Sequence, residues 1–207
     1  MRRMVSVICA EKTRIKDVIR KIEATDVEGY HIDCIDLDVD SNGNILNEIY
    51  KGICFSGKKM KEMHLMVANP EKCISSICKL APDIVYVQHK VENLDEIMKQ
   101  LNNHGIEMGV FVESDQMIDL VQMEKLIKHI RKIQILTVQK KKIGGVWLEY
   151  AKSNIQQLLE LKKRLNAQIE IEIDGACSTE IIKEYSLKGV DAFVLGTKSG
   201  FFDEFYE

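Results

Sequence analysis

Short apolar runs alternate with longer amphipathic stretches along the whole chain. Several of the apolar runs are continuous instead of alternating with polar residues, which is typical of parallel strands covered by helices. The pattern predicts strands over these ranges: Met4–Cys9, Tyr30–Ile35, Met63–Val67, Ile84–Gln88, Glu107–Val112, Gln134–Val138, Ile169–Asp174 and Ala192–Gly196. The sequence therefore predicts eight strands.

The stretches between the strands carry signals for the start and the end of helices. Pro70–Leu80 opens with proline at the first helical position. Asn93–His104 is followed by Gly105 and Ser178–Lys188 by Gly189, and glycine at that place is typical of a helix C-terminus. Alternating strands and helices favour βαβ units with right-handed crossovers.

The number of strand–helix units predicts the fold class. Eight units without a change in composition or a linker favour a closed (β/α)₈ TIM barrel of the α/β class, as a single domain over residues 1–207. An open, doubly wound parallel sheet is the alternative that the same pattern allows.

Composition and charge exclude some classes of protein. Hydrophobic residues make up 45%, charged residues 29%, and the net charge is −3, which gives no reason to expect nucleic acid or an anionic membrane as a partner. No apolar run approaches the ~18 residues of a membrane span, and the N-terminal run is interpreted as a strand, not a signal peptide. The six scattered cysteines are expected to be reduced thiols in a cytoplasmic protein.

Acidic and imidazole side chains interrupt three of the predicted strands. His31 and Asp33 are two positions apart, so both should lie on the same side of their strand. His64 lies in the third strand and Asp174 at the end of the seventh. Catalytic groups of (β/α)₈ barrels lie at the C-terminal ends of the strands, so these four residues are the candidates for chemistry.

Two interpretations of these residues are open. Each one alone could be an interior polar residue with a hydrogen-bond partner, but four buried polar groups together need compensation. A shared divalent cation would satisfy two imidazoles and two carboxylates, and mixed nitrogen and oxygen ligands suit Zn, Fe, Mn or Co without selecting among them.

Six short motifs follow one another in order: SVI at 6–8, HIDCID at 31–36, MHLMV at 63–67, LTV at 136–138 followed by GG at 144–145, IEIDGA at 171–176, and VLGT at 194–197. This ordered set resembles the motifs PSIL, HxDxMDG, DVHLMV, MTVNPGFGG, IEVDGG and VAGS of the ribulose-phosphate 3-epimerase family. The resemblance covers nearly the whole chain.

The resemblance implies a metal-dependent isomerase of carbohydrate metabolism that epimerises D-ribulose 5-phosphate to D-xylulose 5-phosphate, or a related sugar phosphate. It implies one divalent metal ion bound by His31, Asp33, His64 and Asp174. It further implies that Asp33 and Asp174 act on opposite faces of C3, one removing a proton and the other returning one, through an enediolate that the metal stabilises.

Other residues are expected to bind the substrate. Ser6 belongs to the first motif, and Ile35, Met66 and Leu136 correspond to the family's methionine cushion, of which only Met66 retains the sulfur. Backbone amides after strands six to eight are expected to bind phosphate, although ordinary turns would also explain these residues: Gly144, Gly145, Gly175, Ala176, Gly196 and Thr197. The triplet Lys140, Lys141 and Lys142 could add positive charge there or form a solvated loop.

Several positions depart from the family pattern. The run MDGHFVPN becomes IDLDVDSN at 35–42, and the loop NPGFGG becomes QKKKIGG at 139–145. These departures favour a divergent member with another sugar phosphate as substrate. They also allow a second function, a weakly active or inactive barrel that binds a phosphorylated sugar as a regulator. Related lyases and decarboxylases need a lysine in DxKxxD, which this strand lacks.

Three further expectations concern single residues and assembly. Trp147 is expected to pack at the start of a helix, and neither His89 nor His104 is given a catalytic role. The family resemblance implies a homo-oligomer, either a dimer or a hexamer.

Overall fold

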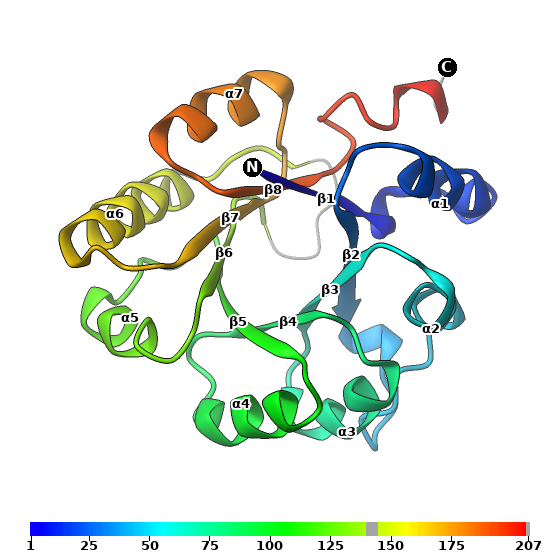
Figure 1. The fold of residues 1–207 in the computed structure, drawn as a ribbon, viewed down its shortest axis with the longest axis horizontal. Coiled ribbons are helices and arrows are strands. Elements are labelled where there is room, and N and C mark those ends of the chain that lie inside the picture. The colour runs from blue at the N-terminus through cyan, green and yellow to red at the C-terminus, as the bar shows by residue number, and fades with distance from the viewer. Residues whose placement is uncertain (140–144, 206–207) are drawn as a thin grey trace.

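The computed structural model describes residues 1–139 and 145–205. Over these residues, eight parallel strands close into a barrel in chain order, β1 to β8, with seven α-helices around the outside (Figure 1). Strand β1 pairs with β8 through Arg2–Ala192 to Val5–Leu195. That pairing closes the sheet, so the predicted (β/α)₈ barrel is confirmed and the open sheet is excluded.

The strands are β1 Arg2–Ser6, β2 Gly29–Ile35, β3 Met60–Met66, β4 Ile84–Gln88, β5 Glu107–Val112, β6 Lys132–Leu136, β7 Glu170–Asp174 and β8 Ala192–Leu195. The helices are α1 Ile15–Ala24, α2 Glu48–Ser56, α3 Pro70–Leu80, α4 Leu94–Asn103, α5 Leu120–Leu126, α6 Glu149–Leu165 and α7 Thr179–Lys188. Short 3₁₀ helices follow β1 at Val7–Cys9, β2 at Asp36–Asp38 and β8 at Asp203–Phe205.

Three predicted strands begin too late along the chain. Strand β1 starts at Arg2, β3 at Met60 and β6 at Lys132, whereas the apolar pattern placed their starts at Met4, Met63 and Gln134. The first residues of these strands include charged side chains, which an apolar pattern leaves out. The predicted strand over Met4–Cys9 also ends too late, because Val7–Cys9 forms a 3₁₀ helix.

The predicted helix ends agree with the structure to within a residue. Helix α7 begins after Ser178, whose hydroxyl accepts a hydrogen bond from the Ile181 amide, and ends at Gly189 in the left-handed conformation. Both features satisfy backbone groups that a helix end would leave unpaired.

The strands divide their side chains between two environments. Alternate residues such as Ile32 and Cys34 pack between the barrel and the helices, in the main hydrophobic core. The other set lies inside the barrel, where Arg2 of β1 reaches Glu62 of β3, Tyr86 of β4 and Glu172 of β7. Contacts between strands so far apart around the ring are possible only through the barrel interior, which is therefore unusually polar.

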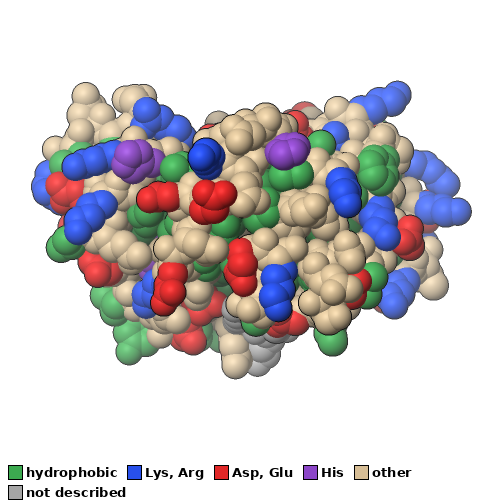
Figure 2. Space-filling view, turned by 90° about the horizontal axis from the view of Figure 1, so that it is seen from below, with side chains coloured by type: hydrophobic (Ala, Val, Ile, Leu, Met, Phe, Trp, Pro, Cys, Tyr) green, Lys and Arg blue, Asp and Glu red, His purple; other side chains and the backbone are tan. Residues whose placement is uncertain are grey.

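The outer surface carries charges of both signs. Figure 2 shows Lys and Arg side chains interspersed with Asp and Glu on the side of the molecule where α3 and α4 lie. Within the described residues, no helix combines the length and the apolar character that crossing a bilayer requires.

Gly29 lies at the start of β2, between Met4 of β1 and Met60 of β3. A Cβ atom at this position would lie 1.9 Å from the Met60 carbonyl oxygen. We expect Gly29→Ala to lower the free energy of unfolding by about 3 kcal/mol, because two backbones would have to separate. The measurement is urea-induced unfolding.

The matched control is Gly52→Ala in α2, where an added Cβ meets nothing within 4 Å. This second substitution should raise the unfolding free energy by about 0.5–1 kcal/mol, since alanine is the better helix former. Equal effects of the two substitutions would contradict the packing described for Gly29.

Candidate active site

The four predicted metal ligands meet at one buried point. His31 and Asp33 lie on β2, His64 on β3 and Asp174 at the end of β7. Both histidines are fully buried, and Asp33 and Asp174 are 6% and 7% exposed. Each of the four residues offers one nitrogen or oxygen atom, and these four atoms all lie within 4.8 Å of one another. The barrel therefore brings together all four residues that the sequence singled out.

The distances within this group match those between the ligands of a metal ion. His31 Nε2 lies 3.4 Å from Asp33 Oδ1 and 3.6 Å from Asp174 Oδ2. His64 Nδ1 lies 3.1 Å from Asp174 Oδ2 and 3.6 Å from Asp33 Oδ1. Metal–ligand bonds of about 2.1 Å in a tetrahedral arrangement separate the ligand atoms by about 3.4 Å. The side chains thus leave the spacing that a central cation needs.

Two ring nitrogens in this group, His31 Nε2 and His64 Nε2, lack a hydrogen-bond partner among the described residues. Among the described residues, no hydrogen bond satisfies the buried Nε2 of His31, although two carboxylates lie near it. Buried polar atoms without a partner are uncommon in folded proteins. An imidazole nitrogen of this kind beside two carboxylates fits a divalent cation, and the mixed donor set suits Zn, Fe, Mn or Co.

The charges of the four groups depend strongly on one another. Burial lowers the pKa of His31 and of His64, but Asp33 and Asp174 outweigh burial and raise both pKa values above the ordinary value. Burial raises the pKa of Asp33, but the two histidines outweigh it and hold that pKa well below its usual range. Without a metal ion, protons on the imidazoles therefore supply the positive charge between the two carboxylates.

A layer of charged residues, Arg2, Glu62 and Glu172, lies inside the barrel on the side of His31 that faces away from the cavity. Glu62 accepts a hydrogen bond of 2.8 Å from His31 Nδ1, which leaves Nε2 free to face the two Asp side chains. Arg2 pairs with Glu62 and with Glu172, both at 2.7 Å. Burial and the nearby Glu62 raise the pKa of Glu172 to about 8. This layer fixes the ring of His31 from the side opposite the site.

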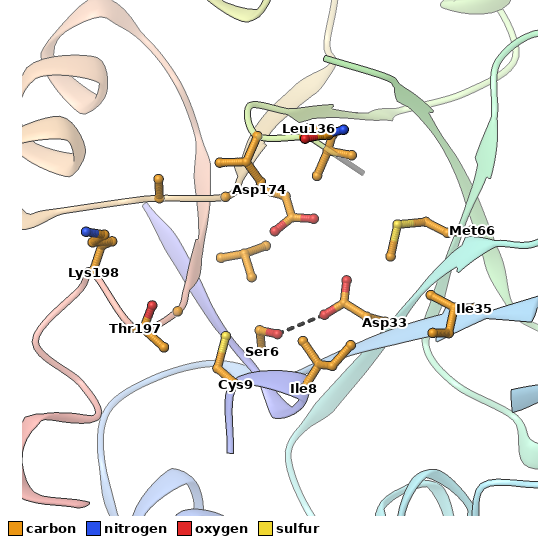
Figure 3. A pocket seen from close by; sticks show the side chains of 16 residues that line it. Ser6, Ile8, Cys9, Asp33, Ile35, Met66, Leu136, Asp174, Thr197 and Lys198 are labelled. Atoms are coloured by element: carbon orange, nitrogen blue, oxygen red, sulfur yellow. Dashed lines mark hydrogen bonds between the residues drawn. The ribbon is translucent and has the colours of Figure 1, made fainter. Parts of the chain in front are cut away.

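A cavity of about 310 Å³ lies directly above the cluster. Asp33 and Asp174 approach it from opposite sides, and Ser6 donates a hydrogen bond of 2.8 Å to Asp33 Oδ2 (Figure 3). Met66 and Ile35 lie at one end, and Thr197 and Lys198 lie at the other. The cavity therefore joins an apolar end to an end with backbone amides and a lysine.

Most of the residues predicted to bind substrate line this cavity: Ser6, Ile35, Met66, Leu136, Gly175, Ala176, Gly196 and Thr197. Gly145 is buried but is not part of the lining. Gly144 and the triplet Lys140, Lys141 and Lys142 lie outside the described residues, so their predicted roles remain predictions.

Sequence reasoning missed several residues of the site. Glu62 and Glu172 each lie two positions before a predicted ligand, His64 and Asp174, and therefore on the same side of the strand. That spacing could have revealed both. Lys198 directly follows a predicted phosphate-binding residue and lines the cavity, but a single lysine gave no pattern to recognise.

His89 and His104 lie apart from this cluster, whereas Cys9 lines the cavity. Buried His89 contacts the Phe111 carbonyl through Nδ1, and His104 contacts the Gln100 carbonyl on the outer surface. All six cysteines are free thiols. Burial raises the pKa of Cys9, beside the cavity, to about 11, which keeps it protonated at neutral pH.

A closed (β/α)₈ barrel with a buried His/Asp cluster at the C-terminal ends of its strands is typical of an enzyme of this fold. The description "Ribulose-phosphate 3 epimerase family" belongs to a family model that matches residues 4–201. The chain belongs to this family, which confirms the resemblance found in the sequence and the expected class of enzyme, an isomerase of the epimerase type.

Individual relatives are distant in sequence. Ribulose-phosphate 3-epimerase from Synechocystis sp. is 23% identical over 195 residues, covering 93% of this chain and 84% of the relative. The enzyme of the same name from Aquifex aeolicus is 25% identical over 139 residues, 66% of this chain and 61% of the relative. The chain is therefore a divergent member of the family.

Solved structures support the fold. The N-acetylmannosamine-6-phosphate 2-epimerase from Clostridium perfringens is similar with a TM-score of 0.65 at 10% identity, covering 99% of this chain and 90% of the other. The tryptophan synthase alpha subunit from Campylobacter jejuni gives 0.61 at 14% identity, covering 95% of this chain and 85% of the other. These likenesses show the barrel fold alone.

Protons and a metal ion compete for the same imidazoles. The raised pKa values of His31 and His64 stabilise the metal-free fold at low pH, and this contribution is lost as the pH rises through the raised values. Metal binding needs neutral imidazoles. We therefore expect the rise in melting temperature on adding Zn²⁺ or Mn²⁺ to increase as the pH is raised above about 6.5, the ordinary pKa of histidine. A rise that is constant or shrinks over this range would contradict the coupling.

Glu62 is expected to raise metal affinity through His31. Glu62→Gln should weaken binding by about 10-fold to 100-fold, measured by competition with a chelator, because the ring loses its anionic partner. The control is Glu172→Gln, which also removes a carboxylate from Arg2 but leaves the His31–Glu62 contact in place. Equal affinities of the two variants would show that Glu62 contributes only to folding.

Proposed function

We propose that this protein is a metal-dependent epimerase of a phosphorylated ketose, with D-ribulose 5-phosphate and D-xylulose 5-phosphate as the first pair to test. One observation carries the proposal: Asp33 and Asp174 approach the same cavity from opposite sides (Figure 3). Epimerisation needs an acid and a base on opposite faces of one carbon. The family to which the chain belongs supports the same reaction.

The two carboxylates are suited to proton transfer. The low pKa of Asp33 keeps it ionised at neutral pH, ready to accept a proton. Asp174, whose pKa is also lowered by His31, lies on β7, three strands from β2 around the ring through β1 and β8, and it approaches the cavity from the side facing Asp33 (Figure 3). A substrate carbon between them would lose its proton to one carboxylate and gain a proton from the other.

A divalent cation is the proposed cofactor. His31, Asp33, His64 and Asp174 would bind it, with Zn, Fe, Mn or Co as candidates. When bound, the cation supplies Lewis-acid stabilisation of the negative charge that develops on adjacent sugar oxygens. The chain's own part is to orient both carboxylates, through Ser6 at Asp33 and His64 at Asp174.

The two ends of the cavity suggest how the substrate lies. Ile35, Met66 and Leu136 form an apolar wall beside the carboxylates, which excludes water from the reacting carbon. The phosphate would lie at the opposite end, against the amides of Gly175, Ala176, Gly196 and Thr197, with Lys198 beside them. We also propose a cytoplasmic homo-oligomer, as the family resemblance implies.

One observation favours the second candidate function, a barrel that binds a phosphorylated sugar without turning it over. The segment after β2 forms the 3₁₀ helix Asp36–Asp38, and Leu37 within it is 88% exposed. The aromatic-Val-Pro-Asn run of the family is replaced here, so the cover that the family places over the substrate differs in this chain.

The test of the proposal is incorporation of solvent deuterium at C3 of ribulose 5-phosphate, with a panel of pentulose and hexulose phosphates and with added Zn, Mn, Fe or Co. The proposal expects metal-dependent exchange with at least one of these ketose phosphates. Binding without exchange across the whole panel would favour the regulatory function instead.

Asp33→Asn and Asp174→Asn should separate the two proton transfers. Each variant should lower kcat for epimerisation by about 10²-fold to 10⁴-fold. Each should still exchange the C3 proton of one epimer with solvent, and the two variants should retain exchange with different epimers. Metal content serves as the control, because both residues are also proposed ligands. Retention of exchange with the same epimer in both variants would contradict opposite-face roles.

A further inference from the structure

The turn after β7 has an unusual backbone. Gly175 and Ala176 both have positive φ angles, 109° and 48°. A side chain at position 175 would clash with Val138, so only glycine fits there. Ala176 adopts the left-handed conformation although it carries a Cβ, which is unfavourable unless neighbouring contacts impose it.

Two donors from outside the turn contact the Gly175 carbonyl oxygen. Trp147 donates from Nε1 at 3.1 Å, and Thr137 donates from Oγ1 at 2.5 Å. The indole packs against the ring of Tyr185 on α7, with 5.0 Å between the ring centroids. The carbonyl of Gly175 is therefore fixed in direction by two side chains, one of which is itself packed against a helix.

This direction determines where the next amide points. In a trans peptide the C=O and the following N–H point in opposite directions. Because the Gly175 carbonyl faces Trp147 and Thr137, the Ala176 N–H faces away from them, and Ala176 lines the cavity. Within the described residues, no backbone acceptor is found for this N–H.

In the turn after β8 a glycine carbonyl is also held by hydrogen bonds, here from within the turn. The Gly196 carbonyl accepts hydrogen bonds from the amide and the hydroxyl of Ser199, at 3.1 Å and 2.7 Å. The Thr197 amide, on the other side of that peptide, contacts Cys9 at the cavity wall. In each of these two turns a glycine carbonyl is held by hydrogen bonds, and the residue that follows it lines the cavity.

We propose that Trp147 is a positioning residue for phosphate, which fixes the Gly175 carbonyl so that the Ala176 N–H is presented to a phosphate oxygen in the cavity. Trp147 acts through the peptide and does not touch the ligand. The inference rests on the proposed function in one respect, that the cavity takes a phosphorylated ligand.

The test compares the binding of inorganic phosphate to metal-loaded wild-type protein and to Trp147→Phe, by titration followed with ³¹P NMR. Phenylalanine keeps an aromatic ring at this position and removes the N–H donor together with the five-membered ring of the indole. The dissociation constant should rise about threefold to tenfold, as expected for the loss of one orienting hydrogen bond. The control, Tyr185→Phe, keeps Trp147 and its ring contact and should bind phosphate like the wild type.

Kinetics add a readout that a purely structural role would not change selectively. For an active ketose phosphate, Trp147→Phe should raise KM by the same factor with little change in kcat. If Trp147→Phe does not fold, Thr137→Val removes the other donor to the same carbonyl and should weaken phosphate binding in the same direction.

The outcomes separate the two proposals. Unchanged phosphate affinity in the variants, or no phosphate binding by the wild type, would overturn the role of Trp147. Phosphate binding that depends on Trp147, in a protein that exchanges no proton of any ketose phosphate, would support this inference and refute the proposed epimerase activity.

Discussion

Four carboxylates, from Asp33, Glu62, Glu172 and Asp174, are buried inside one barrel, and this concentration of negative charge constrains everything around it. Arg2, Glu62 and Glu172 form one layer inside the barrel, below the His/Asp cluster, and there Arg2 forms ion pairs with both glutamates. Burial raises the pKa of Glu172 strongly. In the upper layer the positive charge comes from His31 and His64, whose pKa values are raised by the two Asp side chains. A site that gathers protons onto imidazoles in this way is one in which a divalent cation can replace those protons.

Much of the fold and of the site could be predicted from the sequence. Both follow from the spacing of apolar and polar residues within each strand and from the order of the strands and motifs along the chain. Apolar runs identified the strands, and the two-residue spacing of His31 and Asp33 placed both side chains inside the barrel. The starts of β1, β3 and β6 could not be predicted in this way, because Arg2, Glu62 and Lys132 are charged residues in strands. Arg2 pairs with Glu62 and Glu172 on strands that are not its neighbours, and Lys132 pairs with Glu107 and Glu170 on the neighbouring strands. A pattern along one strand cannot show such partners.

The interpretation of Trp147 shows the same limit. Trp147 lies two residues before the start of α6, and its ring contacts Tyr185 in the second half of α7. The hydrogen bond from its indole to Gly175 joins two loops that are far apart in sequence. The chain also has Ala176 where the family pattern has a second glycine. The chain thus keeps the four His and Asp residues of the family pattern and differs from it at Ala176, beside the cavity.

The central claim is that His31, Asp33, His64 and Asp174 share one cation. Crystals grown with Zn²⁺ or Mn²⁺, with data collected on both sides of the metal's absorption edge, test it most directly. The account predicts one anomalous peak at bonding distance, about 2.0–2.2 Å, from His31 Nε2, His64 Nδ1 and a carboxylate oxygen of each Asp. No peak at this point under saturating metal, with the four side chains directed apart or engaged in separate hydrogen bonds, would contradict it.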